Sequence, residues 1–302
     1  MLSIRTVLCP VDFSPASSRQ VELAANLCRA FQARLVLHHN LTELSSRAAV
    51  GWMWAADHPV SDEASAARMH ELVARASAAG IPVDAQITHG VPVQAVLTMS
   101  QVVDADLLVL TTHGAADDDH PSVTDRVLED SDRSLLALHD IRDEAATLRF
   151  ASAGAPDQHV LVPTDFTREA RPAMAFAFDL ARRLPVELHL LHVRAGGGRG
   201  GDASRDLDAM AALVPPDLGS RVRLHVEAGD PADAIATAAS RIDAACIVMG
   251  AHTRVPWRRW FSRDTSKGVL HRARCPVWYV PAVAEAHARA ADTNGQAETA
   301  TT

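Results

Sequence analysis

An internal duplication constrains the fold of this chain more than any other feature of its sequence. The segment TVLCPVDFSPAS at 6–17 is echoed by HVLVPTDFTREA at 159–170, so that Asp12 and Asp165 stand 153 positions apart. Three further blocks recur in the same order: RLVLHHN with ELHLLHV, HGVPVQAV with AGDPADAI, and ADLLVLTTHG with AACIVMGAHT. Several blocks repeated in one order indicate two copies of one domain, and 302 residues are enough for two ordinary domains.

Within each copy, short apolar runs alternate with longer amphipathic segments. Such alternation is typical of βαβ units, which build a parallel sheet that is buried on both faces. At the start of the first helix, Ser14 offers an N-cap oxygen and Pro15 suits the first turn. In the second copy Thr167 can cap the helix, but Pro172 predicts that this helix starts late or bends.

The duplication also suggests domain boundaries. We predict a first domain at 1–142, a linker at 143–157, a second domain at 158–281 and a disordered tail at 282–302. The linker lacks sustained periodicity, and the tail is rich in Ala, Thr and polar residues with nothing to bury.

Charge and composition argue against several kinds of partner. The formal net charge of -8 gives no general attraction to nucleic acid or to anionic lipid. The N-terminal apolar run is interrupted by Pro10 and Asp12, and no stretch approaches the roughly 18 apolar residues that a membrane span needs. The four cysteines show no C-x-x-C spacing. We therefore expect a cytoplasmic protein with reduced thiols that binds neither nucleic acid nor a membrane.

The repeated blocks resemble the universal stress protein family. The resemblance rests on Pro10-Val11-Asp12, Pro163-Thr164-Asp165, Thr112-His113-Gly114, Gly250-Ala251-His252 and Cys275-Pro276-Val277. It implies an α/β fold of two tandem Rossmann-like domains, each with a five-stranded parallel sheet of order 3-2-1-4-5 and helices on both faces. In such a sheet, ligands bind at the carboxyl ends of the strands where the order reverses.

The resemblance also implies where a nucleotide would lie. In members that hold ATP, the Asp after the first strand faces the adenine, and a loop of the form G-x-x-G, nine residues, G-S/T surrounds the phosphates. Glycines allow backbone N–H groups to approach the phosphates, and the next helix adds the partial positive charge of its N-terminus. Asp12 and Asp165 match the family's aspartate, although an Asp at this place can instead close the following turn.

The first copy departs from this phosphate loop. Thr111 replaces the opening glycine, Gly114 is kept, and the segment to Ser122 is short. Asp117 to Asp119 add three carboxylates, and each opposes a triphosphate by about 1 kcal/mol in water and about 4 kcal/mol at an effective dielectric constant near 20. Ser122 either contacts phosphate or, as we favour, caps the helix through an S-x-x-D pattern. We expect no tight ATP binding here.

The second copy keeps Gly250 but has Thr253 at the second glycine position and Arg263-Asp264 in place of Gly-Ser. The loop between them is the most basic stretch of the chain, and guanidinium groups can replace backbone amides as phosphate donors. If either copy binds an adenine nucleotide, we expect it to be this one. The candidate binding residues are Asp165, Gly250, Arg258, Arg259 and Arg263.

The same basic loop contains Trp257 and Trp260, and the insertion of the first copy contains Trp52 and Trp54. Trp and Arg are enriched at the hot spots of protein interfaces. The loop therefore fits a protein interface, an anion site or a solvated basic face, and we favour the interface.

No sequence pattern predicts a catalytic residue or a metal ligand. The chain has no Walker A motif, no G-x-S-x-G and no recognisable pair of nucleophile and base. We interpret His113 and His252 as turn residues. His189 and His192 lie three apart on a predicted strand, hence on opposite faces, and are not a metal pair. The run GGGRGG at 196–201 fits a dinucleotide motif but follows the second strand of its copy, so we predict a flexible loop.

These observations favour a non-enzymatic stress-response protein that acts through a protein partner or self-association, with weak or lost nucleotide binding and no cofactor. The alternative is a switch that binds ATP or another adenine nucleotide through the second domain. An enzyme acting on an adenylated substrate is a third hypothesis, because folds of this kind host many chemistries.

Overall fold

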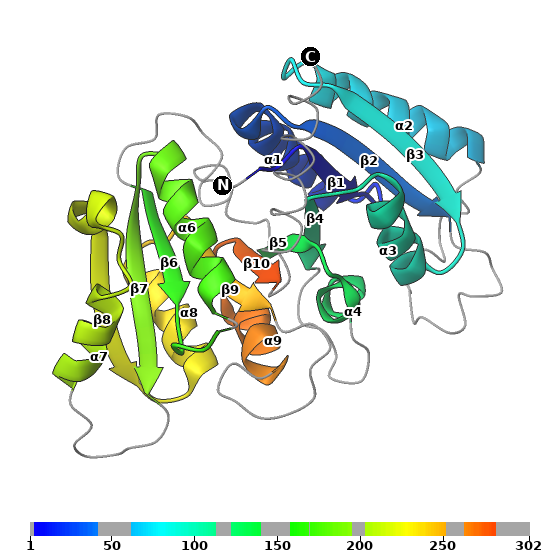
Figure 1. Cartoon of the computed structure of the whole chain (residues 1–302). Coiled ribbons are helices and arrows are strands. Elements are labelled where there is room, and N and C mark those ends of the chain that lie inside the picture. Colours follow the sequence, from blue (N-terminus) through cyan, green and yellow to red (C-terminus); the bar gives the residue numbers. More distant parts are fainter. Residues whose placement is uncertain are drawn as a thin grey trace, which may run out of the picture. The chain divides into compact units, whose positions relative to one another are not determined.

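The computed structural model in Figure 1 describes residues 3–41, 62–112, 122–139, 158–168, 170–194, 203–251 and 263–281. The chain divides into two compact units, which we call the first domain (Ile4–Ser152) and the second domain (Ala153–Thr302, with Met1–Ser3). The predicted linker at 143–157 and the predicted tail at 282–302 lie outside the described residues.

The first domain alternates strands and helices along the chain. Its elements are β1 (Thr6–Pro10), α1 (Pro15–Phe31), β2 (Arg34–Leu41), α2 (Asp62–Ser77), β3 (Val83–His89), α3 (Pro92–Val102), β4 (Leu107–Thr112), α4 (Val123–Asp130) and β5 (Ser134–His139).

The second domain repeats this alternation and adds a short 3-10 helix. Its elements are β6 (Gln158–Pro163), α6 (Arg171–Arg183), β7 (Val186–Arg194), α7 (Ala203–Ala211), η3 (Pro216–Arg221), β8 (Val222–Ala228), α8 (Pro231–Arg241), β9 (Cys246–Ala251), α9 (Arg263–Arg272) and β10 (Val277–Pro281).

Both domains place their first strand in the middle of a parallel sheet. In the first domain the strands follow the order β3-β2-β1-β4-β5, and in the second domain β8-β7-β6-β9-β10. Every pairing within a domain is parallel. Numbered within each domain, this is the 3-2-1-4-5 order that the resemblance implies, and the α/β fold class predicted from the sequence is confirmed.

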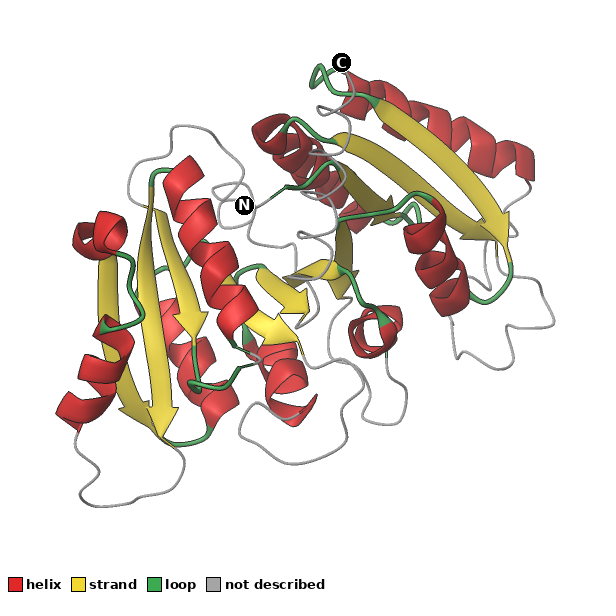
Figure 2. Ribbon diagram, in the orientation of Figure 1, coloured by secondary structure: helices red, strands yellow, loops and turns green. Residues whose placement is uncertain are grey.

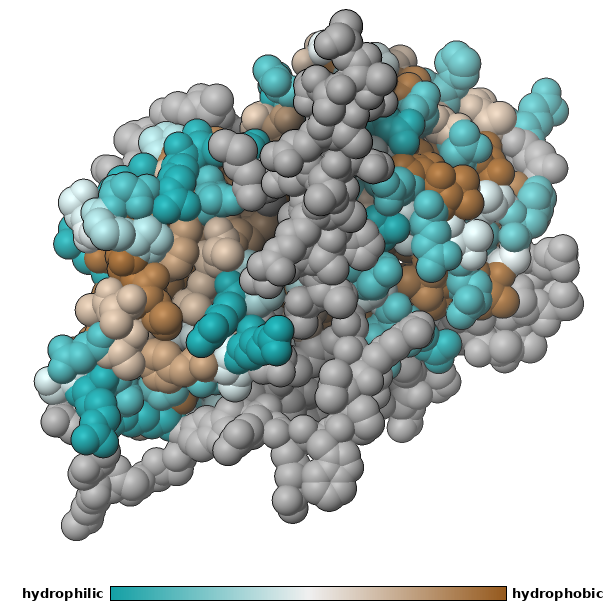
Figure 3. Space-filling model, viewed as in Figure 1, coloured by the Kyte–Doolittle hydropathy of each residue, from teal (hydrophilic) through white to brown (hydrophobic). Residues whose placement is uncertain are grey.

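Helices cover both faces of each sheet (Figure 2). In the first domain α1 packs against α2 and α3 against α4, and in the second domain α8 packs against α9. Strands β1, β4, β6 and β9 are almost wholly buried, as expected for central parallel strands that are covered on both sides. On the surface seen in Figure 3, hydrophilic and hydrophobic residues are interspersed, and neither kind covers a whole domain.

The helix starts differ in detail from the expectation. Helix α6 starts late, with Pro172 in its first turn, as predicted. Ser14 is the N-cap residue of α1, but its side chain makes no capping hydrogen bond, so that part of the prediction is wrong. Likewise, Thr167 precedes the N-cap residue of α6, Ala170, and bonds to Asp165 instead. In both places the aspartate after the strand takes the hydrogen bonds of the turn.

Candidate functional site

The order of each sheet reverses beside its first strand, and there the neighbouring strands separate. Strand β1 pairs with β4 only at Val7↔Leu107 and Leu8↔Leu108. Strand β6 pairs with β9 only at Val160↔Cys246 and Leu161↔Ile247. We call the carboxyl ends of β1 and β4 the first crevice, and those of β6 and β9 the second crevice. Sheets of this kind bind ligands at this position.

An aspartate closes the turn at each crevice. Asp12 Oδ1 accepts hydrogen bonds from the backbone N–H of Ser14 (2.9 Å) and from the hydroxyl of Ser17 (2.7 Å). Asp165 Oδ1 accepts hydrogen bonds from the backbone N–H (2.9 Å) and the hydroxyl of Thr167. The turn-closing alternative is thus observed for both aspartates, and each has one oxygen committed to its own turn.

A phenylalanine and a histidine flank each aspartate. Phe13 and Phe166 have positive φ angles of 60° and 62°, which is unusual for a bulky residue and marks a strained position. Their rings lie 4.1 Å from the ring of His39 and 4.6 Å from the ring of His192. Nδ1 of His39 bonds to the Val11 carbonyl, and Nδ1 of His192 to the Thr164 carbonyl. These pairs were not predicted from the sequence, although both recur at the spacing of 153.

The two crevices differ at one buried position of the helix that follows the first strand. Gln20 of α1 is 2% exposed, and its amide donates to the Pro10 carbonyl on β1 (2.8 Å) and to the Val109 carbonyl on β4 (2.7 Å). The residue 153 positions later is Ala173 of α6, also buried, which has no side-chain donor. The first crevice is therefore bridged by a side-chain amide, and the second crevice lacks that bridge.

The two aspartates also differ. In the second crevice, Asp165 Oδ2 is buried and has no hydrogen-bond partner among the described residues. A buried acceptor without a partner costs about 1–3 kcal/mol. A ligand that donates a hydrogen bond at this oxygen would remove that cost.

The remaining candidate residues are those that the family resemblance predicts near the phosphates. Ser122 caps α4: its hydroxyl accepts from the Asp125 backbone N–H (3.1 Å), and Asp125 accepts from the Ser122 backbone N–H (2.9 Å). This is the predicted capping box. Gly250 lies in β9 opposite Val280. Gly114, Arg258 and Arg259 lie outside the described residues, and of Arg263 only its place as the first residue of α9 is described.

The cysteines are poor nucleophiles. All four are buried free thiols. Burial raises the pKa of Cys28 and of Cys275 to about 12, and it also raises the pKa of Cys9 and Cys246. Since the thiolate is the reactive form, none of these thiols is suited to covalent catalysis at neutral pH.

Together, the reversed strand order and the two crevices define a tandem pair of doubly wound α/β domains. The sequence profile of the universal stress protein family matches residues 3–139 and 158–281, and the chain therefore belongs to that family, as a tandem member. Among the helices described, none has both the length and the apolarity that crossing a bilayer requires.

Two solved structures support the same fold, and a third is similar to part of the chain. A universal stress protein from Archaeoglobus fulgidus is 22% identical, covers 92% of this chain and 97% of its own, and superposes with a TM-score of 0.69. A Pseudomonas aeruginosa protein assigned to the same family is 16% identical. The match covers 94% of this chain and 96% of the other, with a TM-score of 0.60. A universal stress protein in complex with cAMP is 25% identical over 46% of this chain and 98% of its own, with a TM-score of 0.37. Among curated proteins, none matches this sequence.

Proposed function

We propose that this universal stress protein works by association rather than by catalysis, and that its first crevice does not bind nucleotides. The observation that carries the proposal for the first crevice is the bridge from Gln20 to the carbonyls of Pro10 and Val109. It ties the two strands together at the point where they separate, and it occupies carbonyl groups that a ligand would otherwise meet. In the sequence, Asp117 to Asp119 fall within the segment that corresponds to the phosphate loop, and carboxylates in that loop would repel phosphates.

Three features support association without chemistry. The buried cysteines with raised pKa values argue against a thiol nucleophile. Within the described residues, β3 and β8 each pair with one strand only, and an unpaired strand edge can take up another chain. The basic loop with Trp257 and Trp260 has the composition of an interface hot spot.

Because the four cysteines are free thiols, we place this function in the cytoplasm.

A second candidate function is supported by the second crevice. There Ala173 replaces the bridging glutamine, and the buried oxygen Asp165 Oδ2 is available to a donor such as an exocyclic amine. The N-terminus of α9 follows the arginine-rich loop, and a helix N-terminus favours an anion. On this proposal, any ATP or other adenine nucleotide binds in the second domain alone, through Asp165, Gly250 and the loop arginines.

Calorimetry with ATP and Mg²⁺ tests both candidates with a matched pair of variants. Asp12→Asn and Asp165→Asn each keep the oxygen that closes the turn and replace the other oxygen by an NH₂ donor. If the second crevice binds ATP, Asp165→Asn weakens binding at least about tenfold, the value of a hydrogen bond to a charged group, and Asp12→Asn leaves it unchanged. On the same proposal, the double variant Arg258→Ala/Arg259→Ala abolishes the heat of ATP binding.

The outcomes separate the candidates. Absence of binding by the wild-type chain removes the second candidate and leaves association. Binding that is lost in Asp12→Asn but kept in Asp165→Asn overturns the assignment of the first crevice. Turnover of ATP at high protein concentration overturns the non-enzymatic function. For association, sedimentation velocity compares the wild-type chain with Trp257→Ala/Trp260→Ala, and self-association that is equal in both shows that the loop is not the interface.

A further inference from the structure

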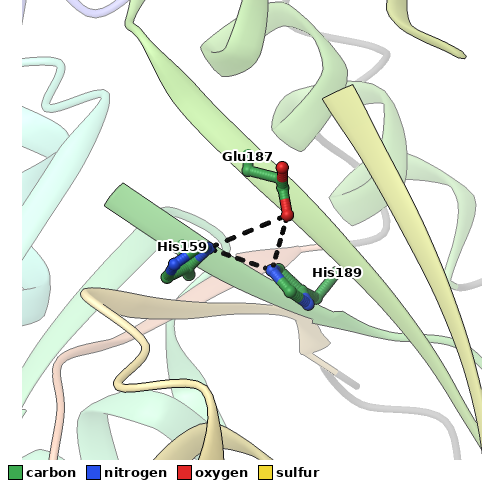
Figure 4. A group of neighbouring side chains, drawn as sticks. All are labelled: His159, Glu187 and His189. Atoms are coloured by element: carbon green, nitrogen blue, oxygen red, sulfur yellow. Dashed lines mark hydrogen bonds and ion pairs between the residues drawn. The ribbon is translucent and has the colours of Figure 1, made fainter. Parts of the chain in front are cut away.

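Three histidines and a glutamate meet on one face of the second-domain sheet, away from the second crevice. His159 lies on β6, Glu187 and His189 on β7, and His225 on β8. The strand register sets His159 beside Glu187, and His189 one step further along the same face. Figure 4 shows the first three side chains converging. His159 and Glu187 are each the second residue of their strand, so the group lies at the amino ends, whereas the crevice lies at the carboxyl ends.

The distances within this group suit a small cation. His159 Nδ1 lies 3.0 Å from His189 Nε2, and Glu187 Oε1 lies 3.4 Å from His189 Nε2 and 4.0 Å from His159 Nδ1. Two ligand atoms bound to one tetrahedral Zn²⁺ at about 2.1 Å are separated by about 3.4 Å. The three atoms thus already stand near the corners of such a site.

We propose that His159, Glu187 and His189 form a binding site for a divalent transition-metal ion of the Zn²⁺ type. Two imidazoles and one carboxylate are a common ligand set for such ions, and imidazole suits Zn²⁺, Co²⁺ and Cu²⁺ better than it suits Mg²⁺ or Ca²⁺. The side chains of His159 and Glu187 are 32% and 29% exposed, against 8% for His189. An ion can therefore enter from solvent, and a water molecule would complete its coordination.

Two neighbours support and tune the site. His189 Nδ1 lies 2.9 Å from His225 Nε2, so that His189 can donate its second N–H while Nε2 faces the ion, which is the usual arrangement around a metal-bound histidine. Arg223 Nε lies 3.3 Å from Glu187 Oε1, and its Nη2 lies 3.4 Å from Oε2. Arg223 therefore competes with the ion for the carboxylate and weakens metal binding.

The first domain offers an internal comparison. The positions that correspond to His159, Glu187 and His189 are Thr6, Arg34 and Val36. There Arg34 bonds to the Thr6 hydroxyl (3.1 Å) and pairs with Asp84 (3.6 Å). A hydroxyl, a guanidinium and an isopropyl group do not bind zinc, so the site has no counterpart at the equivalent positions of the first domain.

Calorimetric titration of the full-length chain, without a histidine tag, with ZnCl₂ at pH 7.5 tests the proposal. We expect one site in the wild-type chain, and a loss of affinity of at least about tenfold in His159→Ala and in Glu187→Gln. Both residues are partly exposed, which makes their replacement compatible with folding, and circular dichroism verifies this. Arg223→Gln should bind Zn²⁺ more tightly than the wild-type chain, since it removes the competing charge.

Two controls make the result specific. His70→Ala removes an exposed histidine of α2 and should bind Zn²⁺ as the wild-type chain does, whereas Mg²⁺ should give no heat. Co²⁺ should produce the visible absorption of a tetrahedral complex in the wild-type chain but not in His159→Ala. Absence of a Zn²⁺ site in the wild-type chain, or unchanged affinity in both His159→Ala and Glu187→Gln, overturns the proposal.

Discussion

Replacement of Gln20 tests the idea that a side-chain bridge closes the first crevice. Gln20→Met keeps the length and approximate volume of the side chain but removes both hydrogen-bond donors. The carbonyls of Pro10 and Val109, now 2.8 and 2.7 Å from the amide nitrogen, lose this partner. Gln20→Ala in addition removes the buried Cγ methylene and the amide carbon and leaves a small cavity.

The size of the effect follows from burial. An unsatisfied buried carbonyl costs about 1–3 kcal/mol. Val109 is fully buried, whereas Pro10 is half-buried and water can partly replace its lost donor. We therefore expect Gln20→Met to destabilise the first domain by about 2–4 kcal/mol. Gln20→Ala should destabilise the first domain by about 1–2 kcal/mol more than Gln20→Met, because each buried carbon group that is removed contributes roughly 0.8 kcal/mol.

Hydrogen exchange measured by mass spectrometry localises this loss. Because every 1.4 kcal/mol is a factor of ten, amides of β1 and β4 should exchange about 30- to 700-fold faster in Gln20→Met than in the wild-type chain. Peptides from β6 and β9 in the same variant serve as the control and should not change. Exchange of β1 and β4 within twofold of the wild-type rate would refute the stabilising bridge.

Three further predictions concern other parts of the chain. Ser122→Ala removes the cap of α4 and should lower the stability of the first domain by about 1 kcal/mol in urea unfolding, with no change in ATP binding; a change in binding with no loss of stability would instead identify a phosphate ligand. Gly268→Ala brings a Cβ within 2.7 Å of Ala232 Cβ on α8 and should destabilise the second domain by about 1–3 kcal/mol, whereas an equally stable variant would mean that α8 and α9 separate easily. Since the pKa of His189 is lowered from 6.5 to about 4, the unfolded chain binds more protons than the folded one between these values, and the stability of the second domain should fall as the pH drops from about 6.5 towards 4. His189→Phe should flatten this decline, and an unchanged slope would contradict it.

Much of the fold could be predicted because its signals are local. The alternation of apolar runs with amphipathic segments indicated βαβ units, and the repeated blocks indicated two tandem domains built from such units. The capping box at Ser122 and the late start of α6 at Pro172 were predictable for the same reason, since each depends on residues within one turn. Even the failed cap at Ser14 has a local cause: the backbone N–H of Ser17, from which the Ser14 hydroxyl would accept, donates to the Ser14 carbonyl instead (3.0 Å).

The candidate sites were predictable only in part. The aspartates were found from their repeat, but the pairing of Phe13 with His39 needed the contact between β1 and β2. The difference between Gln20 and Ala173 is visible in the sequence. Its meaning is not, because the two carbonyls that Gln20 bridges are 10 and 89 positions away.

The cluster of His159, His189 and His225 shows most clearly which features the sequence determines and which depend on the tertiary structure. The sequence alone established that His189 and His192 point to opposite faces of one strand, because side chains alternate along a strand. It did not bring His159 and His225 to His189, from 30 and 36 positions away. Periodicity within a strand is a property of the local backbone and can be read from the sequence, whereas the partner of a side chain across strands depends on register, which exists only once the sheet has assembled.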